Sequence, residues 1–161
     1  MKYGYILIIL ILVTGLVVCQ EASPNFSLKN LDGSLFKMSE YRGKKLILID
    51  FWATWCKPCK KMLKKINIIY EKYKNDLEVL AISVDNSSAF SAVESYVKGK
   101  NFSFTVLLDP DLSVSRIFNP SSKIPYTVLL DRQGKIIYTH SGYLPGIEKE
   151  LEKIISRSIK K

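Results

Sequence analysis

The sequence has little of what a metal site or a disulfide framework requires. It contains three cysteines and one histidine in 161 residues. A structural zinc site needs four thiolate or imidazole ligands, commonly at matched spacing. Cys56 and Cys59 form a close pair, but Cys19 and His140 are far from that pair along the chain. We therefore expect no metal site and no bound cofactor, and two nearby cysteines are too few for a disulfide-stabilised scaffold.

The sequence also lacks internal repeats, low-complexity tracts, interdomain linkers and nucleic-acid-binding motifs. Its formal net charge is +9, from 24 Lys and Arg against 15 Asp and Glu. Many of the lysines lie between positions 57 and 65, where apolar residues follow at helical spacing. Such lysines usually form the solvent-exposed face of an amphipathic helix. We therefore expect one domain that does not bind nucleic acid.

A single long apolar run occupies the N-terminus, from Ile6 to Val18, and is shorter than the roughly 20 residues that span a bilayer comfortably. This pattern is typical of a secretion signal. The run ends at Cys19 in a segment that resembles a bacterial lipoprotein processing site, with Val18 where Gly, Ala or Ser is usual; Cys19 would then be the lipidated first residue. The alternative is an uncleaved signal anchor, from Tyr3 to Cys19. Both predict that residues 1–19 are a signal or anchor and that residues 20–161 lie outside the cytoplasm, tied to the outer face of its membrane.

The motif Trp55-Cys56-Lys57-Pro58-Cys59 follows directly on the apolar run 46–52. Residues three apart on a helix share one face, so the two sulfurs can meet the short Cα separation that a disulfide requires. A CxxC motif between a strand and a helix is typical of a thiol-disulfide exchange site. The alternative is a pair of inert, half-buried cysteines.

The two thiols have different predicted roles. Cys56 falls at the start of a helix that we expect to run to about Tyr73, where free N–H groups and the helix dipole lower the pKa of the thiol. Cys56 is therefore the predicted attacking thiolate, and the positive charge of Lys57 favours the same state. Cys59 lies one turn further, on the apolar side, and is the predicted resolving thiol.

Hydrophobic periodicity predicts strands that alternate with helices, and hence a mixed sheet with helices on both faces. The expected elements are a hairpin within 26–38, a strand from 46, a helix to 73, a strand over 79–84, a helix near 88–98, a strand over 104–108, a short helix over 112–118, strands over 126–130 and 136–139 about a turn at 132–135, and a last helix that Pro145 opens.

The segment Phe51-Trp52-Ala53-Thr54-Trp55-Cys56-Lys57-Pro58-Cys59 resembles the active site of the thioredoxin superfamily, and specifically that of the membrane-tethered TlpA/ResA-like thiol-disulfide oxidoreductases, which are related to the AhpC/TSA redoxins. The similarity extends from about Ser23 to the C-terminus. It implies an α/β thioredoxin-like fold: a central mixed β-sheet with helices on both faces, an N-terminal β-hairpin extension and a central insertion between Val84 and Leu108.

The resemblance also implies a substrate-binding site. Pro125 matches the family's cis-proline, which lies beside the CxxC motif and presents the preceding backbone, here that of Ile124, to an extended substrate segment. Trp55, inside the motif, is the third expected substrate-binding residue. Tyr126 stands where the family commonly has a small hydroxyl residue, so the shape of the groove is expected to differ.

Asp50 lies six residues before Cys56, like the buried aspartate of thioredoxins. Burial would raise the pKa of its carboxyl group and make it a proton acceptor for Cys59. In the ResA-like branch the acid instead follows the next central strand, where this chain has Asn86 after Asp85. We therefore expect Asp50 to be catalytic, and the alternative is that it caps a strand end at the surface.

The leading functional interpretation is a protein-disulfide reductase. Its expected partners are exported proteins with cysteine pairs, such as apocytochromes before haem attachment, and a membrane protein that donates electrons. A peroxiredoxin-like peroxidase is the second interpretation, because segment 23–45 is also similar to that family. Those enzymes have a threonine three residues before the nucleophile, where this chain has Ala53. A non-catalytic binding domain is the third, and its Cys56 would show neither a low pKa nor rapid alkylation.

Overall fold

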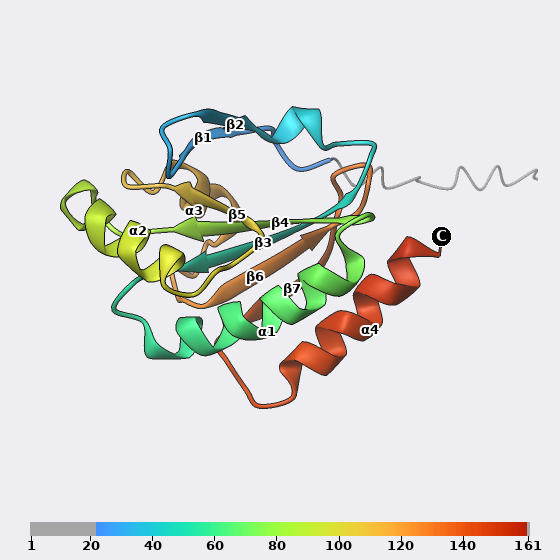
Figure 1. Cartoon of the computed structure of the whole chain (residues 1–161). Coiled ribbons are helices and arrows are strands. Elements are labelled where there is room, and N and C mark those ends of the chain that lie inside the picture. Colours follow the sequence, from blue (N-terminus) through green and yellow to red (C-terminus); the bar gives the residue numbers. More distant parts are fainter. Residues whose placement is uncertain (1–21, 161) are drawn as a thin grey trace, which may run out of the picture.

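A seven-stranded mixed sheet organises residues 22–160, which are the residues that the computed structural model describes (Figure 1). The strand order is β2-β1-β5-β4-β3-β6-β7. The strands are β1 (Ser27–Asn30), β2 (Leu35–Lys37), β3 (Leu46–Trp52), β4 (Leu77–Ser83), β5 (Thr105–Leu108), β6 (Tyr126–Leu130) and β7 (Ile136–Ser141). The predicted signal or anchor, including Cys19, lies outside the described residues. Within 22–160, no helix is long and apolar enough to cross a membrane.

The helices cover both faces of this sheet, so the predicted thioredoxin-like architecture is confirmed. They are α1 (Lys57–Tyr73), α2 (Phe90–Lys98), α3 (Ser113–Phe118) and α4 (Ile147–Ile159), with two 3-10 turns, η1 (Met38–Glu40) and η2 (Ser87–Ala89). Helices α1, α2 and α4 contribute to one hydrophobic core, and α3 contributes to a second core with the N-terminal hairpin. The segment between Val84 and Leu108 supplies η2, α2 and β5.

Strand β3 lies at the centre of the sheet, and all seven of its residues are buried. It pairs with β4 in parallel and with β6 in antiparallel orientation. A near-continuous apolar sequence is what burial on both faces requires. Because side chains alternate along a strand, Leu48 and Trp52 face the core beneath α1, whereas Ile47, Ile49 and Phe51 face the core of α3.

The last helix begins later than predicted. Helix α4 starts at Ile147, two residues beyond Pro145. Gly146, between them, has a positive φ of 96°, a left-handed conformation that interrupts helical geometry and that glycine adopts without steric cost. Ile147, Leu151 and Ile155 on this helix are buried. Ile154 is only partly buried.

Candidate redox site

Cys56 and Cys59 form a disulfide at the point where β3 leads into α1. Their Cα atoms are 5.3 Å apart. Cys56 is the N-cap of α1, and its Sγ accepts a hydrogen bond of 3.2 Å from the N–H of Cys59. Cys56 is 5% exposed and Cys59 is fully buried. Cys56 is therefore the more accessible of the two, and the attacking and resolving roles of the thiols stay predictions.

The start of α1 favours a thiolate on Cys56. The first N–H groups of a helix have no partner within the helix, and together with the helix dipole they stabilise a negative charge at the N-cap. The N–H of Cys59 points at the Cys56 sulfur in this way. Pro58, in the first turn, has no N–H to satisfy. No acidic residue lies in that turn.

Asp50 is fully buried within β3, and the interpretation of it as a surface cap is wrong. Its Oδ1 accepts a hydrogen bond of 2.7 Å from the hydroxyl of Thr127 on β6. Its Oδ2 is buried and has no hydrogen-bond partner among the described residues. Desolvation raises the pKa of the Asp50 carboxyl group to about 7, and the bond from Thr127 partly opposes that rise.

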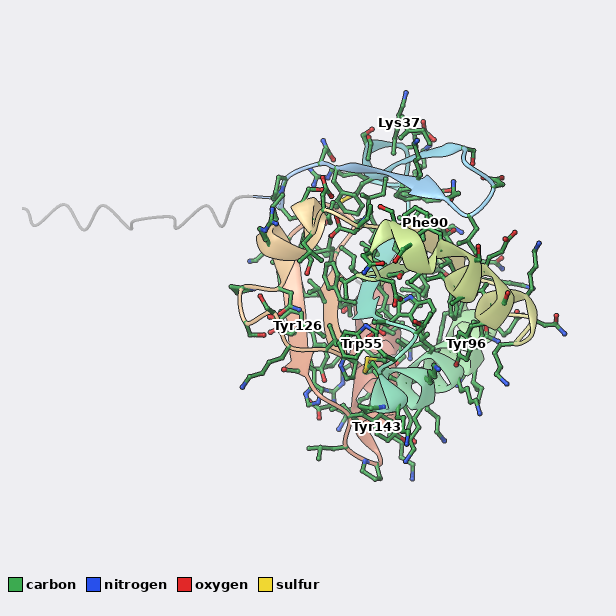
Figure 2. The ribbon with its side chains drawn as sticks, turned by 90° about the vertical axis from the view of Figure 1, so that its left-hand side faces the viewer. Lys37, Trp55, Phe90, Tyr96, Tyr126 and Tyr143 are labelled. Carbon is green, nitrogen blue, oxygen red and sulfur yellow. A yellow bond between two sulfur atoms is a disulfide. The ribbon has the colours of Figure 1, made fainter. Side chains whose placement is uncertain are left out.

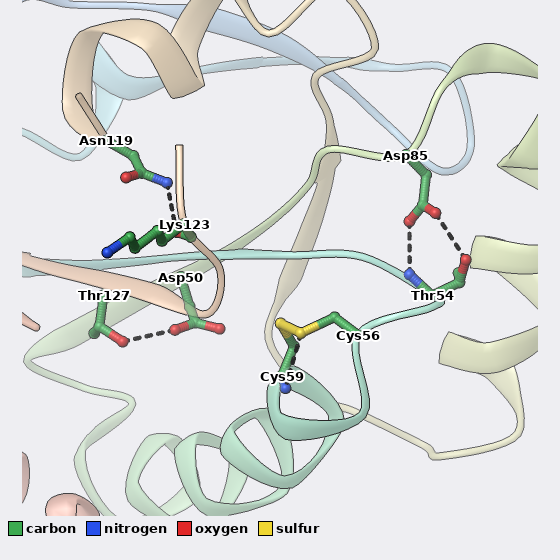
Figure 3. Close-up of a disulfide and its surroundings, with 8 residues drawn as sticks. All are labelled: Asp50, Thr54, Cys56, Cys59, Asp85, Asn119, Lys123 and Thr127. Carbon is green, nitrogen blue, oxygen red and sulfur yellow. Dashed lines mark hydrogen bonds between the residues drawn. A yellow bond between two sulfur atoms is a disulfide. The ribbon is translucent and has the colours of Figure 1, made fainter. Parts of the chain in front are cut away.

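The oxygen of Asp50 without a hydrogen-bond partner lies, in Figure 3, on the side of the carboxyl group that is turned to the disulfide. Asp50 alternates in phase with Leu48 and Trp52, so its side chain faces the core that contains Cys59. Figure 3 shows the carboxyl group between Thr127 on one side and the disulfide on the other. The carboxyl group therefore has a buried oxygen without a hydrogen-bond partner among the described residues, on the face of β3 that is turned to the core containing Cys59.

Asp85 holds the loop that carries the motif, a role that sequence analysis missed. Its two carboxylate oxygens accept hydrogen bonds from the backbone N–H of Thr54, at 2.9 Å, and from the hydroxyl of Thr54, at 2.7 Å. Ser83 donates a third bond, of 2.8 Å, to the same carboxylate (Figure 3 shows the two bonds to Thr54). The signal available in the sequence was an acidic residue that follows a buried strand. This signal does not identify the residue that the acid binds, Thr54, which lies 31 residues earlier.

The Ile124–Pro125 peptide bond is cis, as the resemblance implied. Tyr126 is the register partner of Phe51, so Pro125 lies beside the end of β3 from which the motif emerges. Ile124 packs against the core cluster that contains both cysteines. Neither its N–H nor its C=O has a hydrogen-bond partner among the described residues. A bound segment could therefore pair with this backbone without displacing another bond.

Trp55 is 70% exposed, a high value for so large an apolar side chain. Figure 2 shows it beside the disulfide on the face turned to the viewer, with Tyr126 on one side and Tyr96 on the other. His140 lies on edge strand β7, where it is the register partner of Thr127. Within residues 22–160 no group of three or more acidic, histidine or cysteine side chains is placed to hold a metal ion.

Comparisons with known proteins agree with this geometry. A family model described as the AhpC/TSA family matches residues 19–139. Thiol-disulfide oxidoreductase ResA of Geobacillus kaustophilus is 33% identical over 141 residues, 86% of this chain and 79% of that protein. ResA of Bacillus thuringiensis subsp. konkukian is 32% identical over 123 residues, 76% of this chain and 69% of that protein. The crystal structure of a putative thiol:disulfide interchange protein DsbE from Chlorobium tepidum superposes with a TM-score of 0.79 at 28% identity, covering 87% of this chain and 96% of that one.

Proposed function

Because the chain belongs to the AhpC/TSA family and is a thiol-disulfide oxidoreductase of the ResA and DsbE type, we propose that it reduces disulfides of proteins outside the cytoplasm through Cys56 and Cys59. One observation carries the proposal: the pair joins a slightly exposed sulfur at a helix N-terminus to a fully buried sulfur on the core face that Asp50 shares. Because of this asymmetry, we assign the attack on the substrate to Cys56 and the resolution of the mixed disulfide to Cys59.

In the reduced enzyme, the Cys56 thiolate attacks one sulfur of the substrate disulfide. A bond forms between Cys56 and that sulfur, and the other substrate sulfur leaves as a thiolate. Cys59 then gives its proton to Asp50 and attacks the Cys56 sulfur. The mixed disulfide breaks and the substrate leaves with two reduced sulfurs, while the enzyme keeps the Cys56–Cys59 disulfide. Two electrons have passed to the substrate.

The proposed base is suited to this step. A carboxyl group with a pKa of about 7 is ionised in a substantial fraction of molecules at neutral pH, and it is far more basic than an ordinary aspartate. Its free oxygen is shielded from water, so the proton comes from the buried thiol that faces the same core. Thr127 holds the carboxyl group in place through the other oxygen.

The proposed substrate-binding surface combines an apolar and a backbone element. Trp55 supplies an exposed aromatic contact next to the attacking sulfur. Ile124 supplies an unpaired N–H and C=O, which an extended substrate segment can engage as an added strand does. We propose that Pro125 fixes this backbone beside the motif.

We propose that residues 1–19 tether a single domain, residues 20–161, to the outer face of the cytoplasmic membrane, either through a lipid on Cys19 or as an uncleaved anchor. The apolar run that ends next to Cys19 supports this placement. A membrane protein then returns electrons to the Cys56–Cys59 disulfide. Apocytochromes awaiting haem attachment are the first substrates to test, because their cysteine pairs must be reduced.

A peroxidase function has weaker support. Ala53 stands three residues before Cys56, at the position where the peroxiredoxins have a threonine. Thr54, the adjacent hydroxyl residue, donates its hydroxyl to Asp85. A purely structural binding domain is distinguished by experiment, because its Cys56 would be alkylated no faster than an ordinary thiol.

The deciding measurement is the equilibrium reduction potential of the Cys56–Cys59 pair in the full chain, titrated against glutathione or dithiothreitol with alkylation to trap each state. A potential near or below about −250 mV supports a reductase, and one between about −180 and −120 mV supports an oxidant or isomerase. The Cys59→Ser variant is the matched control, because it should accumulate a mixed disulfide with substrate and never resolve it. If no reversible disulfide forms, the enzyme proposal is wrong.

A further inference from the structure

A basic cavity lies at the end of the sheet opposite the disulfide. It has a volume of about 590 Å³ and is enclosed by the turn between β6 and β7 and the last turns of α4. Three cationic side chains line it, Arg132 and Lys135 from the turn and Arg157 from α4, against one acid, Asp131. Leu46, at the start of β3, forms part of its apolar wall.

Two of the three cations have no acidic partner among the residues that the structure describes. Arg132 pairs with Asp76 at 3.3 Å. Neither Lys135 nor Arg157 forms an ion pair with another residue of 22–160. Asp131 is engaged by the backbone N–H of Lys135, at 2.8 Å. The cavity therefore has a surplus of positive charge over a partly apolar wall, a combination that suits an anionic group attached to a hydrocarbon.

The described chain begins on the same turn. The N–H of Ser23 donates a hydrogen bond of 2.8 Å to the carbonyl of Gly134. The guanidinium of Arg42 bonds the carbonyl of Ser23 and lies against Gly134. Because Gly134 stands next to Lys135, the start of the domain is fixed beside the cavity.

Chain length then limits how far the cavity can be from the proposed membrane anchor. Ser23 is four residue steps beyond Cys19 along the chain. An extended chain spans at most about 3.6 Å per residue, so the connection reaches about 14 Å. The disulfide lies at the other end of β3: six residue steps from Leu46 to Trp52 correspond to about 20 Å. The cavity is thus on the membrane side of the domain, and the disulfide is on the far side.

We propose that this cavity binds the phosphate headgroup of an anionic phospholipid in the membrane to which the chain is tethered, and thereby turns the disulfide away from the bilayer. The proposal rests on the tether described under "Proposed function" and is independent of the direction of electron flow. Electrostatic attraction is screened beyond about 8 Å at physiological salt, so the headgroup must contact Lys135 and Arg157 directly.

The test uses the full chain reconstituted into vesicles of phosphatidylcholine alone or of phosphatidylcholine with phosphatidylglycerol. Hydrogen-deuterium exchange is measured over residues 131–135 and 154–158. We expect exchange to slow several-fold in the phosphatidylglycerol vesicles. The double variant Lys135→Gln/Arg157→Gln should lose this protection. The matched control, Lys61→Gln/Lys64→Gln, removes the same charge from the exposed face of α1 and should keep it.

Three results would overturn the proposal: equal exchange in the two kinds of vesicle, loss of protection in the α1 control variant, or the same protection from inorganic phosphate added to phosphatidylcholine vesicles. The last would identify a site for free phosphate. Flotation of the chain with phosphatidylcholine vesicles reports the tether, and reduction of a model disulfide in detergent reports the redox function. Failure of either is thereby distinguished from failure of headgroup binding.

Discussion

Replacement of Asp50 by asparagine gives the sharpest test of the proposed resolution step. Asparagine keeps the shape of the side chain and can still accept the Thr127 bond, but it cannot take a proton from Cys59. General-base catalysis contributes about 10²–10⁴-fold, so we expect resolution at pH 7 to slow by at least about 100-fold. In the wild type the rate should rise with pH and level off above about pH 7, where the Asp50 carboxyl group is ionised. In the variant this inflection should be missing.

The same substitution should make the folded protein more stable at neutral pH, although it slows resolution. The pKa of the Asp50 carboxyl group is raised from 3.8 to about 7 in the folded protein, so the folded state holds a proton that the unfolded chain releases between these values. Stability is therefore lost as pH rises from about 4 to 7. A difference of about three pH units corresponds to about 4 kcal/mol. The unpaired amide N–H of asparagine costs about 1–3 kcal/mol, so Asp50→Asn should be more stable by about 1–3 kcal/mol above pH 7 and no more stable near pH 4.

Both effects are measurable on the full chain. Resolution is followed as release of thionitrobenzoate from a mixed disulfide with Cys56, between pH 5 and 9, and stability by urea unfolding of the oxidised protein over the same range. Asp76→Asn, which neutralises a partly exposed acid far from the cysteines, is the control and should alter neither profile near pH 7. An unchanged resolution rate in Asp50→Asn would refute the role of this carboxyl group as the base.

Three further substitutions test neighbouring parts of the structure. Thr127→Val removes the bond that lowers the pKa of Asp50, so the inflection in the resolution rate should move upward by about one pH unit, and Thr127→Ser should restore it; an unmoved inflection would show that the bond is unimportant. Asp85→Ala leaves the Thr54 N–H and the Ser83 hydroxyl unpaired, so we expect a loss of about 1–3 kcal/mol in urea unfolding together with slower attack by Cys56 in stopped-flow alkylation. A loss of stability without slower attack would limit Asp85 to a structural role. Ile66→Ala should cost about 2–5 kcal/mol without changing the reduction potential, and a changed potential would show that the core of α1 tunes the site.

Patterns along the chain were sufficient for most of the fold. The run 46–52, apolar except for Asp50, predicted a buried strand, and β3 is one, buried on both faces. Apolar residues at helical spacing placed α1, whose buried side is formed by Met62, Leu63, Ile66 and Ile69. The start of α4 was less predictable, because Pro145 suits a first helical turn but Gly146 adopts a left-handed conformation instead. Local sequence does not fix that conformation.

The candidate site likewise has one part that the sequence predicted and another that it did not. The cysteine pair and the helix start were visible because their geometry is set within four residues. The partners of the two acids were not, because Thr127 is 77 residues from Asp50 and Asp85 is 31 residues from Thr54. Only pairing of β3 with β4 and β6 brings these groups together. Asp50 also has one oxygen without a hydrogen-bond partner among the described residues, and this too follows from the folded sheet and not from the local sequence.

Asp50 makes the fold less stable at neutral pH, and this cost favours a functional role for the residue. It interrupts the one strand that is otherwise wholly apolar, and at neutral pH a buried carboxyl group with an unpaired oxygen lowers the free energy of unfolding. A valine or leucine in its place would continue the pattern of its neighbours. Local choices that conflict with the rest of a fold mark functional sites, because stability alone would remove them. We propose that Asp50 is such a residue: its side chain faces the core that contains Cys59, and removal of its charge should leave a protein that is more stable and slower.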